Sequence, residues 1–241
     1  MTRSTCLYLE LPLTDYREAW ELQRKIVTAK ISRSLSRDVI LVLEHPPVYT
    51  LGRRGGIENL CVSKAFLERK GIAVVPVERG GDITYHGPGQ LVAYPLLDIQ
   101  RTRLGVTDLV GRLEDVMIHT AAAVGISAGR NPLNRGVWID NAKLGSIGIA
   151  IRKGVTFHGM ALNVNLDLTP FSWINPCGLQ GVAMTSLEKE AGRAVDMQEA
   201  RQAGIANLAG ALDMHLERVE LETFMRSLDL SGVDTADGPK L

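Results

Sequence analysis

Cys177 has the sequence context of a reactive thiol, because it lies in the tetrapeptide Asn-Pro-Cys-Gly at 175–178. Proline lacks a backbone donor and glycine breaks helices, so we expect this cysteine in a rigid, shaped loop. A free thiol is mostly protonated at neutral pH, and a nucleophilic cysteine therefore needs a neighbouring cation, base or helix N-terminus. Lys143 is the candidate cation. Cys6 and Cys61 lie among apolar or ordinary residues, which is typical of inert cysteines.

The segment from Arg79 to Gln90 is the most unusual in composition, since it contains four glycines and a proline. Paired glycines let a backbone approach a ligand closely and turn its amides toward it. The segment is not a phosphate-binding P-loop, because the pattern GxxxxGK[ST] is absent from the chain. We expect an irregular substrate cradle here rather than a regular helix or strand; a tight connection between strands is the alternative.

Two further segments combine a polar residue with small neighbours. Lys143 is expected just after a hairpin tip and precedes Leu-Gly-Ser-Ile-Gly at 144–148, whose small residues leave room beside a strand. His158 precedes Gly159 and Met160 inside an otherwise apolar stretch. A lysine at a hairpin tip is commonly solvated and a histidine within a strand is commonly structural, so neither residue alone indicates catalysis. No pair of the five histidines has a usual ligand spacing, so no metal site is expected.

Taken together, four motifs resemble the lipoyl(octanoyl) transferase family. They are RGGDITYHGPGQ at 79–90, KLGSIG at 143–148, FHGMALNVNLDL at 157–168 and NPCG at 175–178. The resemblance follows the motif order over roughly residues 44–187. It implies an enzyme, an octanoyltransferase, that moves an octanoyl (or lipoyl) group from acyl carrier protein to a lysine of lipoate-dependent enzymes, the first step of protein lipoylation. It also implies the fold of lipoate and biotin protein ligases.

The same resemblance assigns roles to individual residues. Cys177 would be the nucleophile that forms an acyl thioester, and Lys143 the group that lowers its pKa. The acyl site would be lined by three sets of residues: Arg79, Gly80, Gly81, Asp82, Ile83, Thr84, Tyr85 and His86; Ser146, Ile147 and Gly148; and His158, Gly159 and Met160. Amides of the glycine-rich segments around Gly80 and Gly145 are candidates for stabilising the oxyanion of the tetrahedral intermediate.

The resemblance also implies the reaction partners. The donor would be octanoyl-acyl carrier protein, and the acceptors the lipoyl domains of 2-oxoacid dehydrogenase complexes and the glycine-cleavage H protein. Exchange of one thioester for another changes the free energy little, so no cofactor and no ATP are expected. Neither nucleic acid nor a membrane is expected as a partner.

Other readings of the sequence remain open. An ATP-dependent lipoate or biotin ligase on the same fold would use a lysine but has no need of Cys177. A non-catalytic binding module would use the glycine-rich segment simply to hold a ligand. A cysteine hydrolase is a weaker option, because no Cys, His and Asn or Asp set stands at a recognisable spacing.

The elements that must position these motifs follow from apolar periodicity and turn residues. Helices are predicted from an N-cap at Thr14 to about Leu35, from Thr107 to a stop at Gly125, and from Asp196 through Leu212. Strands are predicted at 39–43, 73–77, 91–99, 136–140, 144–152 and 155–166. Strands and helices do not alternate strictly, so we expect an α/β fold of the α+β kind, with a mixed β-sheet flanked by helices. A single catalytic domain over 1–230 and a flexible tail over 231–241 are expected.

Composition and charge agree with a globular protein. Hydrophobic residues make up 45% of the 241 residues and charged residues 22%, and no apolar run is long enough for a membrane span. Three cysteines form no disulfide framework and no leader peptide is evident, so a cytoplasmic protein is expected. The 27 basic and 27 acidic residues balance, which disfavours nucleic-acid binding.

That balance conceals an uneven distribution along the chain. Residues 1–160 contain 21 of the basic and 15 of the acidic residues, while 161–241 contain 6 and 12. Because most candidate site segments fall in the basic part, we expect a basic rim at the site that steers acidic carrier proteins toward it. Its expected members are Arg53, Arg54, Arg79, Arg152 and Lys153.

Overall fold

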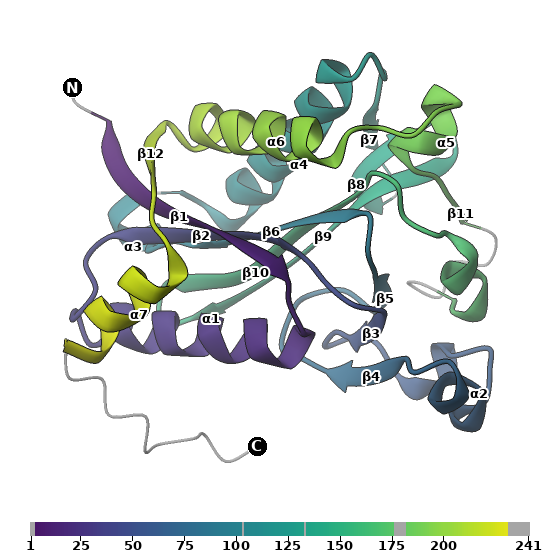
Figure 1. Cartoon of the computed structure of the whole chain (residues 1–241), viewed down its shortest axis with the longest axis horizontal. Helices are drawn as coiled ribbons and strands as arrows, with labels where there is room; N and C mark the ends of the chain where they lie inside the picture. Colours follow the sequence, from purple (N-terminus) through teal and green to yellow (C-terminus); the bar gives the residue numbers. More distant parts are fainter. Residues whose placement is uncertain (1–2, 103, 133, 176–181, 231–241) are drawn as a thin grey trace.

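The computed structural model describes residues 3–102, 104–132, 134–175 and 182–230, and their architecture is a large mixed sheet flanked by helices (Figure 1). The sheet has nine strands, in the order β12-β1-β2-β6-β10-β9-β8-β7, with β11 paired to β9. These strands are β1 (Ser4–Leu13), β2 (Asp38–Glu44), β6 (Gln90–Leu96), β7 (Gly129–Asn131), β8 (Asn134–Ile139), β9 (Ala142–Arg152), β10 (Val155–Asn163), β11 (Ala183–Met184) and β12 (Met214–Arg218). The expected fold class is thereby confirmed.

Helices cover both faces of this sheet, so its central strands are apolar on both sides. The main helices are α1 (Tyr16–Ile31), α4 (Val106–Ala123), α6 (Met197–Leu212) and α7 (Leu221–Leu230); the short ones are α2 (Lys64–Arg69), α3 (Ile99–Thr102) and α5 (Leu187–Ala191). In β2, Ile40 and Val42 pack in the core cluster that includes α4 and α6, whereas Leu41 and Leu43 pack against α1 and α7. This alternation explains why β2 reads as an uninterrupted apolar run.

A second, three-stranded sheet corrects the expectation for the glycine-rich segment. It has the order β4-β3-β5, with β3 (Val48–Leu51), β4 (Ala73–Pro76) and β5 (Ile83–His86). The prediction that residues 79–90 contain no regular element is wrong, because β5 lies within them and Gln90 begins β6. The glycines bracket β5 rather than interrupt it. Tyr85, at the middle of the strand, is buried beside Tyr49 and Phe171, which provides the packing that favours a strand.

Several predicted helix ends are off by a few residues, for local reasons. The N-cap of α1 is Asp15, whose carboxylate accepts hydrogen bonds from two backbone amides, and not Thr14. The helix ends at Ile31, well before Leu35, because the hydroxyls of Ser32 and Ser34 both donate back to the Ala29 carbonyl. Gly105, not Thr107, precedes α4. The start of α6 at Asp196 is confirmed.

Two outer strands, β1 and β12, were not anticipated from the sequence. They pair in parallel, Ser4 with Met214 through Tyr8 with Arg218, and so attach both ends of the described chain to the same sheet edge. The predicted tail at 231–241 lies outside the described residues, and the single domain over 1–230 stays a prediction. No helix in the described part of the chain is long and apolar enough to cross a membrane.

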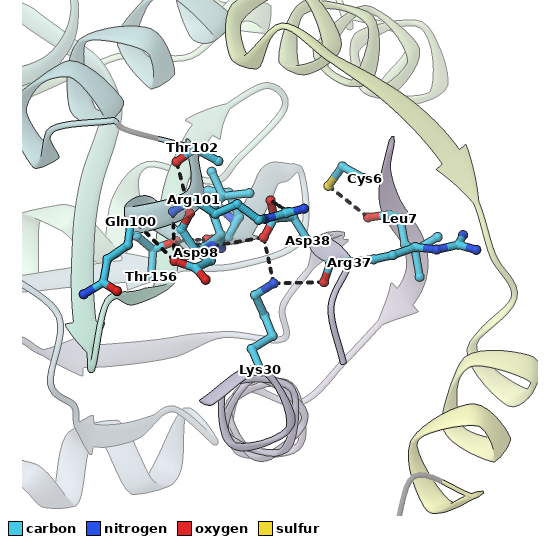
Figure 2. A network of polar contacts seen from close by, with 12 residues as sticks. Cys6, Leu7, Lys30, Arg37, Asp38, Asp98, Gln100, Arg101, Thr102 and Thr156 are labelled. Carbon is cyan, nitrogen blue, oxygen red and sulfur yellow. Dashed lines mark hydrogen bonds and ion pairs between the residues drawn. The ribbon is translucent and has the colours of Figure 1, made fainter. Parts of the chain in front are cut away.

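A buried ionic network fixes α1 and α3 to the sheet (Figure 2). Lys30 Nζ lies 2.7 Å from Asp38 Oδ1, and both side chains are almost completely buried. Arg101 pairs with the other carboxylate oxygen, and the backbone amide of Asp98 donates to Oδ1 at 3.0 Å. Lys30 also donates to the carbonyl of Arg37 at 2.9 Å. A buried charge needs this degree of pairing, so the network specifies where the helices dock.

Asp38→Asn is expected to lower the free energy of unfolding by about 3–5 kcal/mol, because the ammonium of Lys30 stays buried without its counter-ion. Urea unfolding measures the loss. The matched control is Glu217→Gln, which removes the exposed ion pair with Arg37 and is expected to cost under about 1 kcal/mol. Equal losses in the two variants would contradict this account.

Candidate functional site

A cavity of about 270 Å³ brings the described motifs together. It is lined by the loop that leads into β5, by β5 itself, by β9 and β10, and by Tyr16 at the start of α1. The predicted site residues that line it are Lys143, Arg79, Gly80, Gly81, Asp82, Ile83, Thr84, His86, Ser146, Ile147, Gly148, His158, Gly159 and Met160. Segments far apart in sequence thus form one concave surface, as a binding site requires.

Among the described candidates, Tyr85 is the exception. On β5, Thr84 and His86 line the cavity, whereas Tyr85 is directed to the opposite side of the strand. Its ring lies 5.4 Å from that of Tyr49 and 5.7 Å from that of Phe171. Tyr85 therefore supports the strand and does not line the cavity. Cys177, the predicted nucleophile, lies outside the described residues.

Arg79 is buried and is held by β3. Its guanidinium donates to Thr50 Oγ1 at 2.8 and 3.1 Å, to the Thr50 carbonyl at 2.7 Å and to the Gly80 carbonyl at 3.1 Å. The loop then rests on β9, because the Gly80 amide donates to the Ile149 carbonyl at 3.0 Å. A Cβ at Gly148 would lie 2.9 Å from the Gly80 carbonyl oxygen, so only glycine allows this approach. The Gly80 amide is engaged in the scaffold, which removes it from the candidate oxyanion donors.

Lys143 lies on β9 just after the β8–β9 turn, as expected from the sequence. Its Nζ is 5.4 Å from the centroid of the Trp138 ring, a cation–π contact. The neighbouring Gly136 has a φ of 118°, and a Cβ there would lie 2.9 Å from Lys143 Cε. The side chain is half-buried rather than extended into solvent. The turn, the aromatic ring and the glycine together direct a cation to the cavity.

Three buried histidines and two buried tyrosines form a polar cluster beside the cavity. His45 Nε2 lies 2.7 Å from the Tyr94 hydroxyl, and His158 Nδ1 lies 3.3 Å from the Tyr16 hydroxyl. The Tyr16 and His86 rings stack with centroids 5.7 Å apart. Burial lowers the pKa of His45 to about 4 and holds the pKa of His86 well below its usual value. These imidazoles are therefore neutral at pH 7 and add no positive charge to the site.

His158 adopts a left-handed backbone conformation, with a φ of 57°, in the middle of β10. Its amide donates to Gln23 Oε1 at 2.7 Å, which turns the backbone toward α1. Burial lowers the pKa of the imidazole, and the histidine in turn lowers the pKa of Glu78, whose carboxylate lies 3.6 Å from Nε2. Non-glycine residues in this conformation cost about 1–2 kcal/mol and cluster at functional sites. The FHG motif therefore marks a left-handed backbone conformation at His158 within the strand.

The lining is basic overall. Its basic residues are Arg54, Arg79, Arg135 and Lys143, and its acidic residue is Asp82. Asp82 is already bound, since Asn59 Nδ2 donates to both carboxylate oxygens. Arg135 lies 3.5 Å from buried Glu114. The cavity therefore favours anionic or polarised ligands.

The expected basic rim is only partly formed at this cavity. Arg54 and Arg79 line it and Arg53 does not. Arg152 is the last residue of β9, nine residues or about 30 Å from Lys143 along the strand, and Lys153 follows it. Arg135 was not anticipated, because its neighbours in sequence carry no motif.

Other functional candidates also went unnoticed in the sequence. Tyr16 and Tyr94 come from α1 and β6, elements that carry none of the four motifs, so only the fold reveals their position at the cavity. Of the other cysteines, Cys6 is in the core, where burial raises its thiol pKa to about 12, and Cys61 is exposed. Among the residues the structure describes, no three His, Cys, Asp or Glu side chains are grouped so as to hold a metal ion.

Comparisons with known proteins show the family of the chain. The sequence model of the lipoyl protein ligase A/B catalytic domain matches residues 15–209. An octanoyltransferase of Desulfotalea psychrophila (strain LSv54 / DSM 12343) is 53% identical over 196 residues, which is 80% of this chain and 88% of that protein. An octanoyltransferase of Pseudomonas putida (strain W619) is 43% identical over 227 residues, 94% of this chain and 100% of that protein.

Solved structures share the fold at low sequence identity. A bipartite lipoate protein ligase from Thermoplasma acidophilum has a TM-score of 0.71 at 18% identity, covering 96% of this chain and 93% of that chain. A lipoate-protein ligase A bound with ATP has a TM-score of 0.67 at 16% identity, with 99% and 97% covered. At this identity the structures establish the architecture only. From the matched sequence model and the similarity to octanoyltransferases, the chain belongs to the lipoyl protein ligase A/B catalytic domain family, among its octanoyltransferase members.

Proposed function

We propose that this protein transfers an octanoyl (or lipoyl) group to a lysine of lipoyl-domain proteins by way of a thioester on Cys177. The observation that carries the proposal is the single cavity in which Lys143 lies together with the segments 79–86, 146–148 and 158–160. Phe171, which precedes the NPCG motif in the sequence, and Met184, which follows it, also line this cavity. Similarity to octanoyltransferases over most of the chain supports the same reaction.

In the first half-reaction, the Cys177 thiolate attacks the thioester carbonyl of the donor. A new carbon–sulfur bond forms, the bond to the donor sulfur breaks, and the donor leaves as a thiol after taking up a proton. In the second half-reaction, a lysine amine attacks the acyl-enzyme, an amide forms and the Cys177 thiol is regenerated. Lys143, as an ammonium, stabilises the thiolate and gives its proton to the leaving thiol; the amine that results accepts a proton from the attacking lysine in the second half-reaction.

The hydrocarbon chain of the acyl group has an apolar wall to bind. Ile83, Ile147, Met160 and Phe171 all line the cavity. At roughly 0.8 kcal/mol per buried CH₂, an octanoyl tail gains several kcal/mol on entering such a lining. The histidines next to the cavity are neutral, so the free-energy cost of removing water from them when an acyl chain binds is smaller than it would be for charged groups.

The test is intact-mass analysis after mixing the protein with octanoyl-acyl carrier protein in the absence of ATP. One octanoyl adduct is expected, labile to hydroxylamine and absent in Cys177→Ser. An adduct that forms only after ATP is added would replace this proposal with a ligase reaction. Tight binding of octanoate without any adduct would favour a non-catalytic binding module.

The proposed donor is octanoyl-acyl carrier protein, an acidic protein, and the basic lining supports that choice. The value of kcat/KM with this donor is expected to fall as ionic strength rises, because exposed charges are screened over about 8 Å at physiological salt. Arg54→Glu is expected to lower kcat/KM for the carrier-bound donor by roughly tenfold through slower association. An octanoyl thioester of a small neutral thiol has no charged surface to steer, so it is expected to respond little to salt and to lose much less activity in Arg54→Glu than the carrier-bound donor does.

The control for this measurement is Arg152→Glu, which makes the same charge change at the far end of β9. Equal salt sensitivity for the two donors, or equal effects of the Arg54 and Arg152 substitutions, would remove electrostatic steering from the account.

A further inference from the structure

A buried series of hydrogen bonds begins at Arg79 and passes behind the cavity. Thr50 Oγ1 accepts from the guanidinium at 2.8 Å and lies 3.5 Å from His86 Nε2. His86 Nδ1 lies 2.7 Å from Gln90 Oε1. An amide oxygen only accepts, so Nδ1 carries the proton and Nε2 is the acceptor for the Thr50 hydroxyl. The direction of donation is thereby fixed from Arg79 toward Gln90.

The series continues from Gln90 to the backbone of Lys143. Gln90 Nε2 donates to Asn163 Oδ1 at 2.9 Å, and Asn163 Nδ2 donates to the Thr185 carbonyl at 2.9 Å. The Thr185 amide then donates to the Lys143 carbonyl at 3.0 Å. Each residue in the series accepts a hydrogen bond from the residue before it and donates one to the residue after it. The series joins the first motif, the third motif and the segment around Thr185 to the residue that presents the cation.

Burial makes each of these bonds consequential. The exposed fractions are 2% for Gln90, 1% for Asn163 and 0% for Thr185. A buried amide that loses its partner has no water molecule to bond to instead, so breaking one hydrogen bond leaves both its donor and its acceptor without that bond.

β11 is held by this series as well as by its own ladder. β11 contains only Ala183 and Met184, which pair in parallel with Ala142 and Lys143 of β9. Such a short strand has few ladder bonds of its own. The Asn163 side chain, bonded to the carbonyl of Thr185, the residue that follows β11, therefore gives this strand a second attachment next to the cavity-lining residues Lys143 and Met184.

We propose that Gln90 and Asn163 are positioning residues for Lys143, acting through the buried amide series that ends at Thr185. The proposal rests on the proposed function, in which Lys143 assists acyl transfer at Cys177. Neither residue lines the cavity, so their effect passes through β11 and β9 rather than through contact with the acyl group.

The test compares Asn163→Asp with Asn165→Asp. Both are isosteric and both remove an amide donor: Asn163 donates to Thr185, whereas Asn165 donates to the Val195 carbonyl at 2.7 Å, away from Lys143. In Asn163→Asp, hydrogen exchange at the Thr185 amide is expected to accelerate roughly tenfold or more. The rate constant of octanoyl-adduct formation at saturating donor is expected to fall roughly tenfold to a hundredfold with KM little changed. Asn165→Asp is expected to change neither quantity.

A second variant covers the case in which Asn163→Asp does not fold. Gln90→Glu keeps the acceptor for His86 but, when ionised, cannot donate to Asn163, so the same accelerated exchange and the same loss in rate constant are expected. An unchanged adduct rate in a folded Asn163→Asp, or equal losses in the two aspartate variants, overturns the proposal. If the unsubstituted protein forms no adduct, the proposed function fails, while exchange at Thr185 still decides whether the series anchors β11.

Discussion

Lys143→Ala is expected to slow octanoyl-adduct formation by about 10²–10⁴-fold, the range associated with a positioned general acid or base. The variant loses the ammonium that favours the Cys177 thiolate, so alkylation by iodoacetamide near neutral pH is also expected to slow. Folding is expected to change little, because the side chain is only half-buried and its cation–π contact with Trp138 is worth about 0.5–1 kcal/mol. Single-turnover kinetics and alkylation rates across pH measure the two effects separately.

Lys143→Arg separates the charge from the proton transfer. Guanidinium stays protonated, so this variant is expected to recover fast alkylation but not fast acyl transfer. Lys153→Ala is the matched control, because Lys153 follows the other end of β9 and does not line the cavity. Identical alkylation profiles for the unsubstituted protein and Lys143→Ala would show that Lys143 does not activate the thiol.

Much of the candidate site could be predicted from the sequence, because its residues fall in short segments with distinctive composition. Gly148 stands where a backbone passes close to a neighbour, since a Cβ there would lie 2.9 Å from the Gly80 carbonyl oxygen, and such a position requires a glycine that the sequence shows. The third motif around His158 is marked in the same way by Gly159, where a Cβ would meet the Ala93 carbonyl oxygen at 2.1 Å. Their gathering at one cavity agrees with the roles assigned by resemblance, and those roles stay predictions.

What could not be predicted depends on contacts between distant elements. Gln90 and Asn163 are ordinary polar residues in the sequence, and their importance arises because β6 and β10 are neighbours in the sheet. Tyr16 and His45 come from segments without a motif and meet only in the fold. Conversely, the glycine content of residues 79–90 concealed β5, since composition does not reveal that the glycines lie at its ends.

In the fold, too, some elements could be predicted from the sequence and others could not. The central strands were predicted because both of their faces are buried and their apolar runs are continuous. The outer strand β12 was missed because its side chains are mostly exposed and its strand character comes from pairing with β1. The ends of α1 were displaced because an aspartate side chain sets where the helix begins and two serine side chains set where it ends, rather than the apolar pattern.

The three buried histidines predict a steep loss of stability in mild acid. Burial is the main cause that lowers the pKa of His45, His86 and His158, so all three are neutral in the folded protein. In the unfolded chain their pKa values return to about 6.5, so below that pH the unfolded state binds more protons. Stability is therefore retained above pH 6.5 and lost as pH falls, at up to about 1.4 kcal/mol per pH unit for each histidine.

The loss continues for each histidine until the pH reaches the pKa of its folded form, which is about 4 for His45. The slope steepens as the unfolded histidines become protonated, and it approaches its full value about one pH unit below 6.5 for each imidazole that is still neutral in the folded protein. Urea unfolding between pH 7.5 and 5 measures the slope, and NMR titration of the imidazole protons identifies the groups. His45→Gln is expected to reduce the slope more than His119→Gln, the control at an exposed position. A free energy of unfolding that stays constant from pH 7.5 to 5 would mean that these imidazoles charge without leaving the fold, and that the polar cluster beside the cavity is open to water.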